Sequence, residues 1–263
     1  MKRTRAFTLI ELLVVISVIV LLIGLMVPSL GKSREAARTE ICASNVRQIG
    51  IALSGYTMSN KNYYPGDHRS WGGGLSWVAW VPRLRPYLGD MSGFYYCPSA
   101  PKEYRFQPRF GFPLTPGRDP KLYGYMENEF PMTGVEFFCY GYNGWGVQRF
   151  SIPHWGLGGH VAPQEPGAVT APTDRERYFR ENHDYDIKVP FEMYAVADSD
   201  ANGNWDTWIT PQTDAPLCRP GQRHGRRAKT LFCDMGVRFV PYDDFLSARP
   251  ELRRRWNNDN IAH

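Results

Sequence analysis

Residues 7–27 read FTLIELLVVISVIVLLIGLMV, and this apolar stretch decides how the rest of the chain is organised. Its 21 residues are enough to cross the hydrocarbon core of a bilayer as a helix. The polar side chains within it are Thr8, Glu11 and Ser17. An ionised side chain inside a membrane helix costs at least a few kcal/mol, so it is usually kept for a partner. We therefore predict a membrane helix over 7–27 whose carboxylate meets a positive charge from another chain.

A secretory signal peptide and an ordinary single-pass anchor are the two simpler interpretations of this stretch. A signal peptide has a shorter apolar region that ends at a small-residue cleavage site, whereas this stretch runs into Pro28 without such a site. An ordinary anchor gives no reason for Glu11. The basic residues Lys2, Arg3 and Arg5 predict that the N-terminus stays cytoplasmic and that the body of the chain is exported.

The helical pattern continues beyond the apolar stretch, over residues 28–57. Pro28 lacks an amide hydrogen and can bend the helix where it leaves the membrane. Apolar side chains then recur at spacings of three, four, seven or eight, which is typical of one helix face: Leu30, Ala37, Ile41, Ile49, Leu53 and Tyr56. We predict an amphipathic extension that packs this face on the globular body.

The composition changes at about residue 58. Residues 58–263 are rich in Gly, Pro and aromatic residues, with short apolar runs between turn signals. This pattern predicts one globular head of short antiparallel strands and long loops. One hairpin is predicted from strands at 192–197 and 205–210. A second is predicted from 228–233 and 237–240, with Gly236 supplying the positive φ of the turn.

The net charge gives little support for nucleic-acid binding. The formal charge is +5, and loss of the three cations before residue 7 would leave 5 − 3 = +2. The remaining clusters, at 226–227 and 253–255, are more often solvated faces than phosphate tracks.

The N-terminus, KRTRA followed by FTLIELLVVI (residues 2–16), resembles that of type IV prepilins and type II secretion pseudopilins. The resemblance implies that a prepilin peptidase cuts between Ala6 and Phe7 and methylates the new amine. It also implies that Glu11 pairs with the amine of a neighbouring subunit. Pro28 matches a proline that many pilins carry, whereas Ala6 stands where the family usually has Gly. The implied fold is α+β and pilin-like, with a long N-terminal helix packed on an antiparallel head with long loops.

The predicted divisions are therefore a leader over 1–6, a transmembrane helix over 7–27, the extension over 28–57 and the head over 58–263. The implied partners are other filament subunits, the prepilin peptidase and an inner-membrane assembly machinery. The expected location is the inner membrane, with the N-terminus cytoplasmic and the head periplasmic, and then a filament. The alternative function is a membrane-tethered exported protein whose head binds a surface ligand or glycan. An enzyme is not expected, because no nucleophile, base and orienting group emerge together.

Patches of the chain beyond the membrane helix resemble a large group of prepilin-like proteins with a C-terminal His-x9-Asp-Gly signature. His224 and Asp234 have the required spacing, but Met235 follows Asp234 and Gly236 comes one position late. Residues 42–50, 62–65 and 140–144 resemble the same group. A His–Asp pair could serve as a general base or as two metal ligands. We favour instead a hydrogen bond between His224 and Asp234 that ties a loop to the second hairpin.

Residues 198–206 read DSDANGNWD and resemble an EF-hand calcium loop in part. Oxygen-bearing side chains occupy positions 1, 3, 5, 7 and 9, with Gly203 at the sixth: Asp198, Asp200, Asn202, Asn204 and Asp206. The twelfth position, where a Glu belongs, is Ile209. Major pseudopilins hold calcium in a C-terminal loop, which favours Ca²⁺ by analogy. A solvated Asn-Gly turn is the alternative.

The five cysteines are Cys42, Cys97, Cys139, Cys218 and Cys233. Because their number is odd, at least one thiol is free or pairs between chains. Their spacing contains no Cys-x-x-Cys, so a zinc site is not predicted. Because disulfides persist in exported proteins, we predict a Cys42–Cys97 bond that pins the helix to the head, with buried free thiols as the alternative.

The stretch from Trp71 to Trp80 sets three tryptophans beside three glycines. Such rings can stack on sugars, but core or loop-anchoring roles are more frequent and are favoured here.

Overall fold

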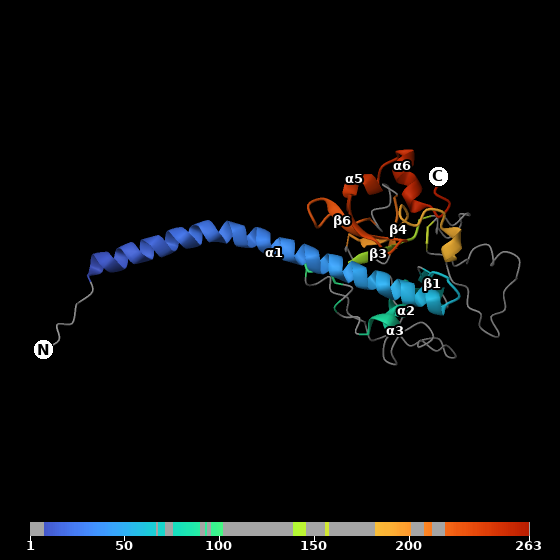
Figure 1. The fold of residues 1–263 in the computed structure, drawn as a ribbon, viewed down its shortest axis with the longest axis horizontal. Coiled ribbons are helices and arrows are strands. Elements are labelled where there is room, and N and C mark those ends of the chain that lie inside the picture. Colours follow the sequence, from blue (N-terminus) through green and yellow to red (C-terminus); the bar gives the residue numbers. More distant parts are fainter. Residues whose placement is uncertain are drawn as a thin grey trace, which may run out of the picture.

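The computed structural model describes residues 8–66, 68–71, 76–89, 93, 96–101, 139–145, 156–157, 182–200, 208–211 and 219–262. A single helix, α1 (Leu9–Ser59), runs for 51 residues from the N-terminus into the head. Figure 1 shows its first half projecting away from the head and its second half lying along it. The chain is therefore α+β with a long N-terminal helix, as predicted.

Five strands form a mixed sheet in the order β5-β3-β4-β6-β7. These strands are β3 (Tyr140–Asn143), β4 (Tyr194–Asp198), β5 (Trp208–Ile209), β6 (Arg227–Phe232) and β7 (Val237–Pro241). The pairs β3–β4, β4–β6 and β6–β7 are antiparallel, whereas β3–β5 is parallel. We predicted an antiparallel sheet, but the sheet is mixed. The reason is that β5 lies at the edge beside β3 and runs parallel to it.

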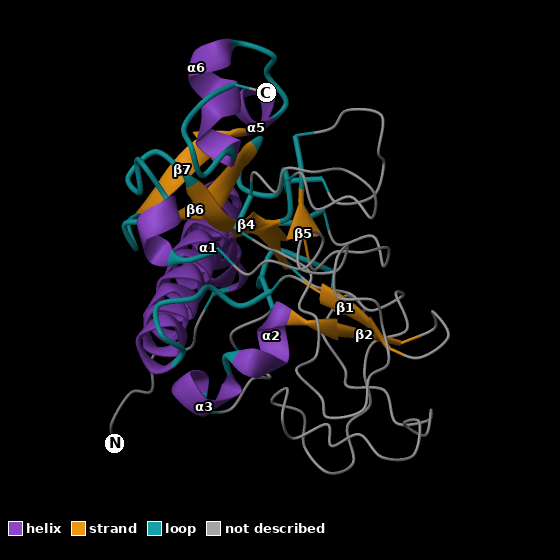
Figure 2. Ribbon diagram, turned by 90° about the vertical axis from the view of Figure 1, so that its right-hand side faces the viewer, coloured by secondary structure: helices purple, strands orange, loops and turns teal. Residues whose placement is uncertain are grey.

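The remaining described elements are short. They are β1 (His68–Trp71), β2 (Ser76–Ala79), α2 (Trp80–Arg83), α3 (Arg85–Leu88), η3 (Asp184–Asp186), α5 (Tyr242–Phe245), α6 (Pro250–Arg253) and η4 (Arg254–Trp256). Strands β1 and β2 pair antiparallel in a separate two-stranded sheet. Figure 2 shows α1 and α2 on one side of the five-stranded sheet and α5 and α6 on the other.

Each face of the five-stranded sheet covers its own core. The α1-side core joins buried residues of α1 and α2 to side chains of the sheet, among them Val46, Ile49, Trp80, Tyr142 and Leu231. The opposite core is half aromatic and consists of Tyr194, Ala197, Ile209, Ala228, Phe232, Val240, Phe245 and Trp256. A register shift in β4 between Tyr194 and Val196 interrupts the strict alternation of side chains between the two faces.

The buried face of α1 differs from the predicted stripe. Ile49 and Leu53 are buried as predicted, but Leu30, Ala37 and Ile41 are exposed. The first buried residue of α1 is Cys42, because the head packs only on the later part of the helix. Gly50 permits this approach, since a Cβ there would lie 2.8 Å from Cδ1 of Leu231 on β6.

The first predicted hairpin is wrong and the second is confirmed. Strand β4 has β3 and β6 as its neighbours, so it does not pair with β5. Strands β6 and β7 do pair, with Ala228 opposite Val240. However, the residue with positive φ in their turn is Met235, at 64°, and not Gly236. Met235 occupies the position after Asp234 where the His-x9-Asp-Gly signature has Gly, and it adopts the positive φ that Gly adopts most readily.

Candidate functional site

The N-terminal half of α1 is an apolar surface without cover from the head. Side chains from Leu9 to Leu30 are exposed, and Leu9, Ile10 and Leu25 each show 70% or more of their surface. This helix is long and apolar enough to cross a membrane, and none of its most apolar stretch is buried. Because such a surface is unfavourable in water, it suggests membrane anchoring.

Glu11 and Thr8 form a capping box at the start of α1. The Thr8 backbone N–H and hydroxyl both donate to Glu11 Oε2, at 2.9 and 2.8 Å. In return, the Glu11 N–H donates to Thr8 Oγ1 at 3.3 Å. The carboxylate is thus exposed and held beside the first turn. A carboxylate has about four acceptor positions, so these two bonds leave capacity for a further donor.

Pro28 lies inside α1, and the helix continues through it. The helix curves along its length in Figure 1. The processing residues Ala6 and Phe7 lie outside the described residues.

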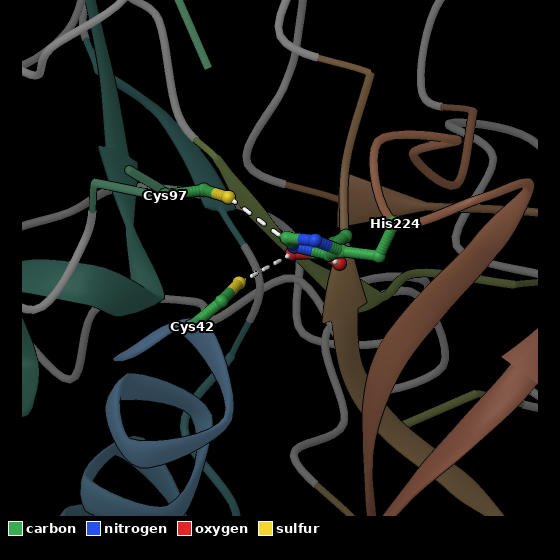
Figure 3. A group of neighbouring side chains, drawn as sticks. Cys42, Cys97 and His224 are labelled. Atoms are coloured by element: carbon green, nitrogen blue, oxygen red, sulfur yellow. Dashed lines mark hydrogen bonds and ion pairs between the residues drawn. The ribbon is translucent and has the colours of Figure 1, made fainter. Parts of the chain in front are cut away.

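A second group of functional side chains lies buried where α1 meets the head. Cys42 from α1, Cys97, Asp198 at the end of β4 and His224 before β6 place their sulfur, oxygen and nitrogen atoms within 4.8 Å of one another. All four residues are buried. Figure 3 shows both sulfurs and the His224 ring turned toward one another. Sequence reasoning named each residue but did not join all four.

The predicted pairing of His224 with Asp234 is wrong. His224 contacts Cys97 Sγ through Nε2 at 3.4 Å and Thr39 Oγ1 through Nδ1 at 3.1 Å. Asp234 stays at the β6–β7 turn, where it accepts hydrogen bonds from the Gly236 N–H at 2.9 Å and Arg238 Nη2 at 2.5 Å. Each end of the signature therefore has its own partners.

Cys42 and Cys97 are brought together as predicted, but as free thiols and not as a disulfide. Cys139 and Cys233 are also buried free thiols, and Cys218 lies outside the described residues.

Two of the five residues of the calcium prediction are described. Asp200 is exposed, whereas Asp198 is fully buried. The Asp198 carboxylate accepts hydrogen bonds from the Cys42 thiol and the Lys229 N–H, at 3.2 and 3.0 Å, and is thereby engaged in the buried group. The residues Asn202, Asn204 and Asp206 lie outside the described residues, so calcium binding stays a prediction.

The surroundings of the buried group shift the protonation of its members. The hydrogen bond from Cys42 lowers the pKa of Cys97, with further lowering from His224 and Arg223, against the effect of burial. The same hydrogen bond and burial raise the pKa of Cys42. Burial lowers the pKa of His224, but the hydrogen bond to Cys97 and the charge of Asp198 outweigh it, so this pKa is raised. Burial also raises the pKa of Asp198, which Arg223 counteracts.

The Trp71–Trp80 stretch lies partly outside the described residues. Trp80 itself is buried and stacks on Tyr142, with ring centroids 5.3 Å apart. This is the core role that the sequence favoured.

Comparison with known families identifies the N-terminal segment. Residues 1–27 match the family model described as "Prokaryotic N-terminal methylation motif". The chain thus begins with a prepilin-type methylation motif. Residues 31–94 match "Protein of unknown function (DUF1559)", a family typical of pseudopilin-like proteins. Together the two matches cover less than half of the chain. No curated protein and no solved structure matches it.

Proposed function

We propose that this chain is a structural subunit of a type IV pilus-like or type II secretion filament. A prepilin peptidase would cut between Ala6 and Phe7 on the cytoplasmic face and methylate the new amine. The observation that supports this most is the uncovered apolar half of α1, which carries Glu11 in its first turn and overlaps the methylation motif.

The two halves of α1 suit two tasks. Before assembly, the exposed apolar half would keep the subunit in the inner membrane, with the head on the periplasmic side. During assembly, the same surface would pack against the helices of other subunits. The part of α1 from Cys42 onward is packed on the head, so it would carry the head along. Contacts between subunits that do not close into a ring produce an open helical filament.

Glu11 would set the register between neighbouring subunits. Its carboxylate would meet the N-methylated Phe7 amine of a neighbour, so that neither charge is buried alone. The capping box supports this role because it fixes the carboxylate at the helix start. The chain's part in the assembly would be mechanical and not enzymatic.

The filament fraction of cells tests this proposal. The chain is expressed with a pilus or pseudopilus assembly machinery and its prepilin peptidase, and filaments are sheared off and sedimented. We expect the chain in the sheared fraction when the peptidase is active. With an inactive peptidase as the matched control, it should stay in the membrane. If it stays in the membrane while the machinery assembles its own subunits, the membrane-tethered binding protein is the better account.

A further inference from the structure

We propose that Cys42, Cys97, Asp198 and His224 form a closed tetrahedral Zn²⁺ site that fastens the head to α1. The four side chains come from separate parts of the chain: α1, the segment after α3, the end of β4 and the segment before β6. Cysteine thiolates, histidine nitrogens and carboxylate oxygens are all zinc ligands, and this set of four differs from the common Cys2His2 set only by a carboxylate in place of one histidine. Ca²⁺ would find an oxygen on only one of these four side chains, whereas it takes six to eight oxygen ligands.

The ligand atoms lie within 4.8 Å of one another, and three of their separations are close to those of a tetrahedron around zinc. Bond lengths of about 2.0–2.3 Å place neighbouring ligand atoms about 3.3–3.8 Å apart. Cys42 Sγ lies 3.2 Å from Asp198 Oδ1, and Cys97 Sγ lies 3.4 Å from His224 Nε2. His224 Nε2 lies 3.7 Å from Asp198 Oδ2. Small movements of these side chains would thus suffice to place all four around one ion.

The surrounding contacts orient the ligands. Thr39 Oγ1 donates to the Glu35 carbonyl at 2.8 Å, so it can accept from the Nδ1–H of His224 at 3.1 Å. That hydrogen bond leaves the Nε2 lone pair facing Cys97 and Asp198. A metal-binding histidine usually has such an acceptor on its other nitrogen. On the carboxylate side, the Lys229 N–H donates to Asp198 Oδ2 at 3.0 Å.

The charges of the site also balance. Two thiolates and a carboxylate carry three negative charges, and Zn²⁺ would reduce this total to one. The Arg223 guanidinium is mostly buried and lies 3.6 Å from Asp198 Oδ1, where it supplies the remaining positive charge. Tyr140 adds a hydroxyl 3.1 Å from Cys42 Sγ. Because isolated buried charges are costly, this balance makes a bound zinc ion compatible with a buried site.

The position of the site gives it a structural role. Cys42 is the first buried residue of α1, and the other three ligands belong to the head. Zinc would therefore join α1 to the head at the point where the exposed part of the helix ends. Binding free energy at a structural zinc site adds to folding free energy, so the bound ion would resist separation of the head from α1.

Metal content and spectroscopy of the full chain in detergent micelles test the site. After purification under reducing conditions, we expect about one zinc ion per chain. Chelation should lower the melting temperature, and Zn²⁺, but not Ca²⁺, should restore it. Substitution with Co²⁺ should give the d–d bands of a tetrahedral ion and a thiolate charge-transfer band. These measurements on the wild-type chain need no variant to fold.

Variants then assign the ligands. Cys97→Ser and His224→Gln should each lose most of the bound zinc and the tetrahedral Co²⁺ spectrum. Thr39→Ala should weaken zinc binding by about 10–100-fold, because it removes only the orienting contact. Cys233→Ser is the matched control, since Cys233 is buried in the same core but stands outside the group, and it should keep its zinc. A wild-type chain without zinc whose Cys42 and Cys97 are joined by a disulfide would overturn the proposal. Zinc retained equally in the Cys97 and His224 variants would overturn it as well.

Discussion

The Glu11→Gln variant is expected to enter the membrane, to be processed, and yet to be missing from sheared filaments. The amide oxygen of Gln can still accept from Thr8, so the capping box and the helix start are preserved. The negative charge is lost, however, and the Phe7 amine of the neighbour would be buried without a partner. Leaving one member of a buried ion pair alone costs about 3–5 kcal/mol, which weakens each contact by at least about a hundredfold.

The control for this variant is Glu40→Gln. Glu40 is also on α1, its side chain is largely exposed, and its carboxylate lies 3.7 Å from Lys229 Nζ. Lys229 is buried but keeps the Phe239 ring centroid 3.6 Å from its Nζ, and the exposed Glu40 position leaves no carboxylate buried, so filaments should form normally. Filament yields for Glu11→Gln equal to those of the wild type would show that the charge does not govern assembly.

The Trp256→Ala variant is expected to destabilise the head by about 3–5 kcal/mol. Trp256 is fully buried, and its ring packs edge-on against Tyr194 and Phe245, with centroids 5.2 and 5.8 Å away. Its indole N–H also donates to the Phe245 carbonyl at 3.2 Å. The substitution would leave a cavity in the aromatic core opposite α1. Because domains are stable by only about 5–15 kcal/mol, this is a large share of the total.

Thermal melting of the full chain in detergent measures this effect. For a head of this size, the melting temperature should fall by roughly 6–20 °C. Phe191→Ala removes an exposed aromatic ring and serves as the control, with an expected change within about 0.5 kcal/mol. Equal melting temperatures for Trp256→Ala and the control would show that this core contributes little to stability.

The N-terminal helix could be predicted from sequence because its signals are local. The apolar run and its single carboxylate lie within residues 7–27, and the continuing helical pattern extends the prediction into the head. The buried face of α1 was harder to predict from the sequence. Leu30 and Ile41 fit the periodicity of a buried stripe but are exposed, because periodicity does not say how far along a helix its partner reaches.

The buried group of Cys42, Cys97, Asp198 and His224 depends on long-range contacts. Cys42 and Asp198 are separated by 156 residues, and Cys97 and His224 by 127. No local spacing rule joins residues so far apart, and the absence of Cys-x-x-Cys argued against zinc. A similar limit explains the wrong hairpin, because β5 lies beside β3 and not beside β4, its predecessor along the chain. The β6–β7 hairpin was found because its two strands are adjacent in both sequence and space.

The intact mass and N-terminal residue of the chain, co-expressed with a prepilin peptidase, test the filament account most directly. We predict a mature chain of 263 − 6 = 257 residues that starts at N-methylated Phe7. A chain that still starts at Met1 in the presence of a peptidase active on its own substrates would contradict the account. Cleavage near Ser29 would contradict it too, since the chain would then be a secreted protein without its apolar helix.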